Sequence, residues 1–216
     1  MKKDIIITIG REFGSGGREI GQRIAERLGI PFFDKELLVK AAKDSGIAAE
    51  RFVEHDELLR PVYTPMAIIN NERWEDDFFQ FYGYFSNDGV ARAQFRTMHN
   101  VAKENPSCVI IGRCADYILQ NYPQVLSIFI YADMDARVER IMKLHNLNEK
   151  KAKQLIKKMD KQRANYYNFY TDQKWNDMCH YDLCVNSTPL GVEGTVNAIC
   201  NYIAIVQENM ENTPEE

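Results

Sequence analysis

The sequence predicts a three-layer α/β fold whose central sheet has five parallel strands. Apolar, β-branched or aromatic runs supply the strands, at residues 5–9, 31–34, 108–112, 126–132 and 181–186. The runs are continuously apolar rather than alternating, which is typical of strands that are buried on both faces. Helical patterns lie between them, and strands that alternate with helices favour a parallel sheet with right-handed crossovers.

The helices are expected between these runs. Apolar residues recur every four positions after the first strand until Gly29 and Pro31 end the helix (Ile20, Ile24, Leu28). A helix capped by Asp135 follows the 126–132 strand, and a final helix covers about 190–209. The stretch from about 48 to 105 does not follow this alternation of strands and helices and is interpreted as a mainly helical insertion. Its acidic and aromatic part, 73–85, is interpreted as local core or as a homodimer contact.

Composition excludes several classes of function. The chain has 216 residues, enough for one sizeable core, and 27 Lys and Arg against 31 Asp and Glu give a net charge of −4. No global basic field exists to attract nucleic acid or an anionic membrane, so a phosphate site must be built from local charge. Five cysteines without a C-x-x-C pair favour reduced thiols over zinc or disulfides. No apolar run approaches the roughly 18 residues of a membrane span, so we expect a cytoplasmic protein.

A glycine-rich loop follows the first strand directly, with four glycines between Gly10 and Gly17. A Rossmann fingerprint that starts at Gly14 fails, because its third glycine would fall on Glu19. A Walker loop, G-x-x-x-x-G-K-[ST], fits in part. With Gly17 as its last glycine, Arg18 stands in the lysine position and Glu19 in the hydroxyl position.

The loop nevertheless has the physical properties of a phosphate cradle. Glycines at this density let successive N–H groups converge on one anion, and the following helix adds its positive end. Arg18 retains a positive charge and can grip phosphate oxygens bidentately, and Ser15 offers a hydroxyl. The alternative is a tight turn without a ligand. Glu19 suits the helix dipole but would repel a bare phosphate, so it faces either a magnesium ion or an arginine.

Further positive charge follows the other predicted strands. Arg113 comes directly after 108–112, and Arg137 and Arg140 are three positions apart on one helix face beyond 126–132. Ligands of α/β sheets bind at the carboxyl ends of the strands, so these arginines are candidates for phosphate binding.

A basic amphipathic helix is predicted over 148–167, which carries seven Lys or Arg. Most of its lysines are interpreted as solvated surface. Arg163 differs, because Asp160 and Tyr167 are three and four positions away and can orient it.

In order and spacing these motifs resemble those of the cytidylate kinase-like proteins, in the nucleoside monophosphate kinase branch of P-loop folds. The motifs are the glycine loop, "FFD" at 32–34, "IIGR" at 110–113, the R-x-x-R helix, "D-x-x-R" at 160–163 and "YDLCVNST" at 181–188. The resemblance covers about 4–45 and 88–205, whereas 48–87 matches poorly.

The resemblance implies one kinase-like domain, 1–216, with a three-layer P-loop NTPase-type fold. Its core would come from about 1–47, 105–145 and 180–210. A helical insertion at about 48–104 would bind the acceptor, and a helical lid at about 146–170 would close over the donor.

The resemblance also assigns an acceptor site. Arg113 and Arg92 match the arginines that hold the monophosphate in cytidylate kinases. Cys114 stands where that family has an aspartate that contacts the base, and Asp116 is close enough to substitute for it. Asp34 and Lys35 fall where the family places another acceptor-site pair.

On the donor side, the resemblance implies ATP with Mg²⁺. The phosphates would lie on Gly14, Ser15, Gly16, Gly17, Arg18 and Glu19. Arg18, Arg163 and Asp160 would be the catalytic residues, and Arg137 and Arg140 the surround of the phosphates. The ATP phosphates would hold the metal, with the Ser15 hydroxyl as a candidate protein ligand.

Three hypotheses follow from the sequence. The first is a kinase that transfers the γ-phosphoryl group of ATP to a nucleoside monophosphate, CMP or dCMP. The second is a kinase of the same fold with another small acceptor, because Cys114 replaces the expected aspartate. The third is a non-catalytic nucleotide-binding protein, because the loop lacks the lysine and the hydroxyl.

Overall fold

The computed structural model describes residues 3–34, 36–46 and 88–212. Lys35 and most of the predicted insertion, including the aromatic stretch 73–85, lie outside the described residues.

The sheet confirms the predicted fold class. Its strands are β1 (Ile6–Arg11), β2 (Phe32–Phe33), β3 (Cys108–Ile111), β4 (Val125–Tyr131) and β5 (Leu183–Asn186). All neighbouring strands are parallel, in the order β2-β3-β1-β4-β5. Because β1 occupies the centre, the loop that follows it lies in the middle of the carboxyl edge of the sheet.

The helices fill the connections. They are α1 (Gly17–Leu28), α2 (Glu36–Ser45), α5 (Asp88–Glu104), α6 (Ala115–Ile118), α7 (Met134–His145), α8 (Glu149–Thr171) and α9 (Gly191–Asn212), with a 3₁₀ turn at Met178–His180. Gly29 ends α1 in the left-handed region at φ 66°, as expected. The predicted cap of α7 was wrong. Asp133 is the residue with extended backbone before this helix, and Asp135 lies within its first turn.

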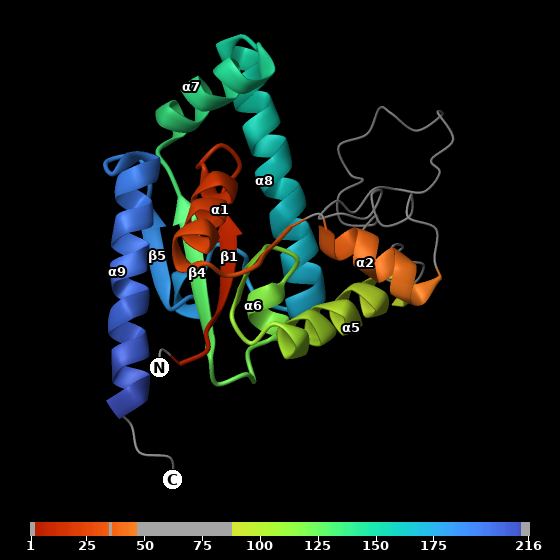
Figure 1. The fold of residues 1–216 in the computed structure, drawn as a ribbon. Helices are drawn as coiled ribbons and strands as arrows, with labels where there is room; N and C mark the ends of the chain where they lie inside the picture. The colour runs from red at the N-terminus through yellow and green to blue at the C-terminus, as the bar shows by residue number, and fades with distance from the viewer. Residues whose placement is uncertain (1–2, 35, 47–87, 213–216) are drawn as a thin grey trace.

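One face of the sheet is covered by α1 and α9. Ile7 and Ile9 of β1 pack with Ile20 and Ile24 of α1 and with a row of buried residues on α9 (Val196, Ile199, Ile203). The apolar spacing of four residues along α1 places its buried side chains on one stripe, which is the stripe that meets β1. Figure 1 shows α9 on the opposite side of the sheet from α5 and α6.

The other face is covered by α5 and α6. Ile6 and Ile110 pack with Met98 and Val101 of α5 and with Leu119, which follows α6. The part of the predicted insertion that the structure describes therefore contributes to the core of the domain. At its carboxyl-terminal end, α8 packs on the same side through Tyr166 and Tyr167, which cluster with Phe129 and Trp175.

The carboxyl ends of the strands point toward α7 and the first part of α8 (Figure 1). The predicted lid range 146–170 coincides with α8. Within 3–34, 36–46 and 88–212, no helix combines the length and apolar character needed to cross a membrane.

The core supports a stability prediction. Ile20→Ala should lower the free energy of unfolding by about 2–5 kcal/mol, because Ile20 is fully buried between α1 and the sheet. Ile205→Ala is the matched control, since this isoleucine of α9 is 56% exposed, and it should change stability by less than about 0.5 kcal/mol. Urea unfolding of the purified variants measures both values. Equal losses would contradict the assignment of α1 to the core.

Candidate functional site

The glycine loop spans the turn between β1 and α1 and places two glycines in the left-handed region. Gly14 has φ 86° and Gly16 has φ 81°, backbone conformations that other residues rarely adopt. Gly16 is the residue that precedes α1, so the first N–H groups of the helix, which lack intrahelical acceptors, open toward the loop. This geometry is that of an anion-binding helix start.

Space above the loop is limited by two arginines of α7. A Cβ atom on Gly16 would lie 3.0 Å from the Arg140 Nη1 atom, and one on Gly14 would lie 3.2 Å from the Arg137 Cβ atom. A Cβ atom at either position would be closely approached by these arginines, and the positive φ of both positions adds to the preference for glycine. The structure thus brings together the two predicted glycines and both predicted arginines.

The Ser15 hydroxyl faces inward. The residue is 1% exposed, its Oγ donates to the Glu12 carbonyl at 2.9 Å, and it accepts from the Gly17 amide at 3.3 Å. The Ser15 carbonyl accepts from the Ser187 hydroxyl at 2.8 Å, which ties the loop to the segment after β5. In this arrangement Ser15 shapes the loop and does not present its hydroxyl to a metal ion.

A buried ion-pair network joins the loop to α8. The Arg137 side chain is almost fully buried, donates to the Phe13 carbonyl at 2.8 Å, and pairs with both Glu12, at 3.1 Å, and Asp160. Asp160 also accepts from the Phe13 amide at 2.7 Å. Both polar groups of the Phe13 backbone are therefore held by this network.

The Glu12 carboxyl group is a weaker acid in this network than an ordinary glutamate. Burial raises the pKa of its carboxyl group, and the Ala132 amide and the Arg137 charge offset the rise only in part. The Glu12 carboxyl group also accepts a hydrogen bond from the Ala132 amide at 3.1 Å, which fixes Glu12 to the end of β4.

Arg163 of α8 reaches the end of β1. Its Nη1 atom donates to the Arg11 carbonyl at 3.0 Å, and its guanidinium lies over the Phe13 ring at 5.7 Å from the ring centre. Asp160 and Arg163, the predicted D-x-x-R pair, thus contact the two ends of the same short segment, 11–13.

A second carboxylate, Asp34, follows β2 and holds two arginines. Arg18 Nε donates to one of its oxygens at 2.7 Å, and Arg113 Nη1 donates to the other at 3.2 Å. Burial alone would raise the pKa of Asp34, but the hydrogen bond from Arg18 and the charges of Arg113 and Arg11 outweigh it. The pKa therefore lies below its ordinary value and the group is ionised at neutral pH.

Arg113 occupies a strained turn. Gly112, Arg113 and Cys114 follow β3 with φ values of 65°, 56° and 57°. The left-handed region is costly for residues other than glycine, and such strain persists where the surroundings hold it. Here the buried Arg113 side chain is held by Asp34 and by the Ile111 carbonyl, at 3.1 Å. The turn points the arginine inward.

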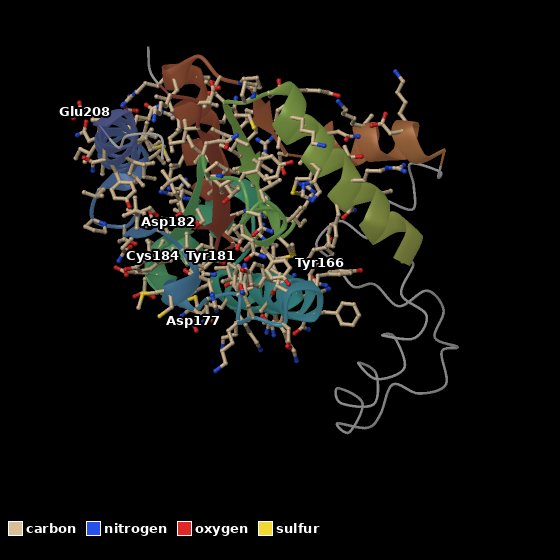
Figure 2. All side chains as sticks on the ribbon, turned by 90° about the horizontal axis from the view of Figure 1, so that it is seen from below. Tyr166, Asp177, Tyr181, Asp182, Cys184 and Glu208 are labelled. Atoms are coloured by element: carbon tan, nitrogen blue, oxygen red, sulfur yellow. The ribbon has the colours of Figure 1, made fainter. Side chains whose placement is uncertain are left out.

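A narrow cavity of about 20 Å³ lies beside this turn. We call it the acceptor cavity, because two residues predicted from the sequence for an acceptor site, Arg113 and Asp116, lie in its lining. It is lined by Gly10, Arg11, Gly112, Arg113, Cys114, Asp116, Arg163, Tyr166, Tyr167, Trp175 and Tyr181. Figure 2 shows Tyr166 and Tyr181 coming from α8 and from the segment before β5. Arginines thus line one part of the cavity and aromatic rings another. A molecule larger than one water can enter only if α8 or the aromatic side chains move.

Asp116 lies in the wall of the acceptor cavity. Burial raises the pKa of its carboxyl group, although a hydrogen bond from the Tyr167 hydroxyl, at 2.6 Å, opposes the rise. Asp116, the predicted substitute for the missing aspartate, therefore lines the same cavity as Cys114, which occupies that aspartate's position.

The remaining predicted residues have less complete descriptions. Glu19 pairs with two arginines, Arg23 at 2.8 Å and Arg140 at 3.5 Å. Arg92 lies in α5, but its side chain is outside the described part of the chain, as is Lys35.

Arg11 was missed by sequence reasoning. It is the last residue of β1 and lines the acceptor cavity with Arg113 and Arg163. The available signal was a charged residue at the end of an apolar strand, directly before the glycines.

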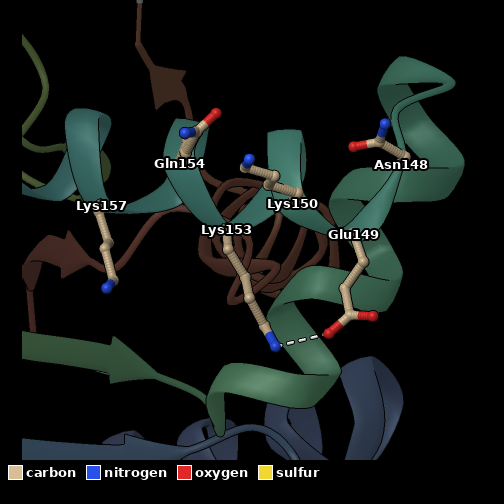
Figure 3. Close-up of a pocket in the computed structure, with 6 residues that line it drawn as sticks. All are labelled: Asn148, Glu149, Lys150, Lys153, Gln154 and Lys157. Carbon is tan, nitrogen blue, oxygen red and sulfur yellow. Dashed lines mark hydrogen bonds and ion pairs between the residues drawn. The ribbon is translucent and has the colours of Figure 1, made fainter.

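The basic face of α8 lies apart from these groups. Lys150, Lys153 and Lys157 line an open hollow together with Asn148, Glu149 and Gln154 (Figure 3). Lys153 pairs with Glu149 at 2.6 Å, as residues four apart on a helix do. This geometry is that of a solvated helix face.

Metal ligation has little support among the side chains that the structure describes, since no group of three or more His, Cys, Asp or Glu residues lies close enough together to hold an ion. Glu12 and Asp160 are engaged by Arg137.

Comparison with known proteins agrees with this geometry. The chain is 27% identical over 209 residues to the cytidylate kinase of Pyrococcus horikoshii, covering 94% of this chain and 92% of the relative. A crystal structure of an uncharacterized protein from Eubacterium ventriosum superposes with a TM-score of 0.68 at 33% identity, covering 93% and 98% of the two chains. A gluconokinase from Sinorhizobium meliloti has the same fold, with a TM-score of 0.54 at 14% identity and 98% coverage of both chains.

The family is shown by a model that spans most of the sequence. Residues 6–189 match the model of the cytidylate kinase-like family, a range that runs from β1 to the segment after β5 and so includes the glycine loop, the acceptor cavity and α8. The chain belongs to the cytidylate kinase-like family.

Proposed function

We propose that this protein is a kinase that transfers the γ-phosphoryl group of Mg-ATP to a nucleoside monophosphate, with CMP or dCMP as the acceptor. The observation that carries the proposal is the position of the acceptor cavity. Arginines line it beside the glycine loop, and aromatic rings with Asp116 form another part of its wall. A phosphate at one end and a flat base at the other match this arrangement. Family membership and the names of the relatives support the reaction class.

The donor side of the proposal rests on the glycine loop. The phosphates of ATP would accept hydrogen bonds from the first amides of α1, and Arg140, whose guanidinium lies over Gly16, would neutralise their charge. Phosphoryl transfer needs positioning and charge neutralisation more than covalent chemistry, so this arrangement suits it. Mg²⁺ would arrive with ATP as part of the substrate.

The acceptor side rests on Asp34, Arg113 and Asp116. Arg113 is already held by Asp34, so in this proposal Asp34 orients the arginine that binds the acceptor phosphate. Asp116 would accept a hydrogen bond from the amino group of cytosine, since one of its oxygens takes the Tyr167 hydroxyl and the carboxylate has further acceptor capacity. Arg92 remains a candidate for binding the acceptor phosphate.

In this proposal, α8 closes over the acceptor cavity when the substrates are bound. Asp160 and Arg163 bind the segment at the end of β1 in the present arrangement, and the acceptor cavity is too small for a nucleotide. We therefore infer that α8 moves away to admit the acceptor and returns to bring Arg163 to the transferring group. Closure of this kind excludes water that would otherwise hydrolyse the donor.

A second candidate is a kinase of the same fold for a different small acceptor. Cys114 in place of an aspartate favours it, because a thiol buried beside the cavity accepts hydrogen bonds weakly. A non-catalytic nucleotide-binding protein is the third candidate, and the position of Arg163 at the end of β1 counts against it.

The acceptor screen is the main test. Wild-type protein with Mg-ATP should release ADP fastest with CMP or dCMP among the nucleoside monophosphates and a set of small sugars and hydroxy acids. Asp116→Asn should raise the KM for CMP by roughly 10-fold or more, the loss of a hydrogen bond to a charged group, and leave the KM for ATP unchanged. Lys157→Ala, on the solvated face of α8, is the control. ADP release that occurs only with a sugar would favour the second candidate. No ADP release with any acceptor would favour the third candidate.

Arg163→Ala should lower kcat by about 10³-fold, the contribution an arginine makes when it contacts a transferring phosphoryl group. The Kd for ATP should change little, because that contact is made only during transfer. Stopped-flow turnover and calorimetric titration measure the two quantities. A variant with normal kcat would show that α8 has no part in catalysis.

Asp34→Asn should lower the free energy of unfolding at neutral pH by about 3–5 kcal/mol, because the buried Arg113 loses its charged partner. The lowered pKa of Asp34 means that its contribution is complete above the ordinary value of 3.8 and is lost as pH falls below it. The gap between wild type and variant in urea unfolding should therefore narrow below pH 3.8. A gap independent of pH would show that Asp34 is not ionised in the folded protein.

A further inference from the structure

The strand that leads into the glycine loop ends in a buried arginine, Arg11, to which neither the family motifs nor the proposal above gives a role. Side chains alternate along a strand, so Arg11 lies on the same face of the sheet as Ile9, which packs against α1. The residue is 9% exposed. A cation this buried needs partners, and its surroundings identify them.

The Arg11 side chain crosses the first residue of α1. A Cβ atom on Gly17 would lie 2.6 Å from the Arg11 Cβ atom and 3.1 Å from its Cγ atom. The first of these distances is shorter than any real Cβ contact. Residue 17 must therefore be glycine as long as residue 11 carries a side chain. The space beside the start of α1 is filled by the Arg11 side chain of β1 and not by a side chain of the helix.

The charged end of Arg11 lies toward the acceptor. Arg11 lines the acceptor cavity together with Arg113 and Arg163, and its positive charge helps to keep Asp34 ionised. Its carbonyl accepts the hydrogen bond from Arg163. The side chain therefore begins beside the first residue of α1, where donor phosphates would bind, and its charge acts on Asp34 and the acceptor cavity, where the acceptor would bind.

We propose that Arg11 is a catalytic residue whose guanidinium contacts the phosphoryl group while it moves from donor to acceptor. The inference rests on the proposed kinase function. An oxygen of the acceptor phosphate forms a bond to the γ-phosphorus, and the bond from that phosphorus to the β–γ bridging oxygen breaks, so that ADP leaves with the electron pair. Arg11 forms no covalent bond and gives up no proton. Its charge offsets the negative charge on the oxygens of the moving group, which is the work of the lysine in a Walker loop.

Arg18, the residue that the sequence motif puts in the lysine position, is less suited to this work. Its side chain is 57% exposed, its Nε is bonded to Asp34, and its guanidinium lies over the Phe32 ring at 5.8 Å. A cation in contact with water is screened far more strongly than a buried one. Arg18 thus supports Asp34 from the solvent side, whereas Arg11 faces the cavity.

The first test compares Arg11→Lys with Arg11→Met. The two side chains have similar stems, so both fill the space beside Gly17, and they differ in the charge. The lysine variant should keep a kcat at least ~10-fold above that of the methionine variant, which corresponds to about 1.4 kcal/mol. Thermal unfolding is measured alongside, so that a difference in folding is not taken for a difference in catalysis. Equal kcat values in two folded variants would overturn the inference.

A compensating pair provides the second test. Gly17→Lys alone should be impaired by the contact with the Arg11 Cβ atom, and Arg11→Gly alone should lose kcat by about 10³-fold. Arg11→Gly combined with Gly17→Lys removes the contact and returns a cation to the start of α1. The combined variant should exceed Arg11→Gly by at least ~10-fold in kcat. A combined variant no faster than Arg11→Gly would count against the inference.

A binding measurement separates this inference from the proposed function. ADP with aluminium fluoride imitates the planar transferring group, and calorimetry compares its Kd with that of ADP alone. Arg11→Met should weaken the aluminium fluoride complex by at least ~10-fold and ADP alone by much less. If wild type transfers phosphate to no acceptor, the proposed function fails, and this comparison still decides the role of Arg11. A variant that binds both as tightly as wild type, or a wild type that does not distinguish them, would overturn the inference.

Discussion

The site depends on one buried guanidinium, that of Arg137. It binds the Phe13 carbonyl and pairs with Glu12 and Asp160, so a single side chain of α7 holds the glycine loop and α8 together. Removing one partner of such a network leaves a buried charge uncompensated, which is far more costly than the net value of the pair. The position of Phe13, and through it the turn that presents Gly14 and Gly16, follows from this network. Arg137 is therefore a positioning residue for the loop.

Carboxylates pair with several of the positive charges of the site. Arg137 is paired with Glu12 and Asp160, and Arg140 with Glu19. Arg113 and Arg18 share Asp34. A phosphate-bearing ligand would compete with these carboxylates for the guanidinium groups, so ligand binding and rearrangement of the ion pairs are expected to be coupled. In the proposed kinase, this coupling would give α8 a physical reason to move on nucleotide binding, because Asp160 belongs to one of the pairs.

In the proposed kinase, acceptor recognition and the reaction itself would be carried by different parts of the structure. The loop, α7 and the end of β1 supply the cations, and they surround the point at which β1 ends in the centre of the sheet. The aromatic residues of the acceptor cavity and Asp116 come from α6, α8 and the segment before β5. In the proposed kinase, a change of acceptor could therefore arise in the second group without disturbing the first.

Sequence alone determined the fold class and the order of its elements. Continuously apolar runs and apolar residues every four positions reflect burial, which is local information, and they placed the strands and α1 within one or two residues. The glycines after β1 and the arginines after β3 and β4 could also be read directly, because the carboxyl ends of parallel strands share one edge of the sheet.

Only the tertiary structure decided how these charges are used. No pattern in the sequence shows that Arg18 turns toward Asp34, that Ser15 faces inward, or that Arg137 is the residue between the loop and Asp160. Arg11 was missed for the same reason, since its contact with Gly17 depends on the alternation of β1 and the angle at which α1 leaves the loop. Such pairings are set by distances of a few ångströms between segments far apart in the chain, and spacing along the sequence carries no information about them.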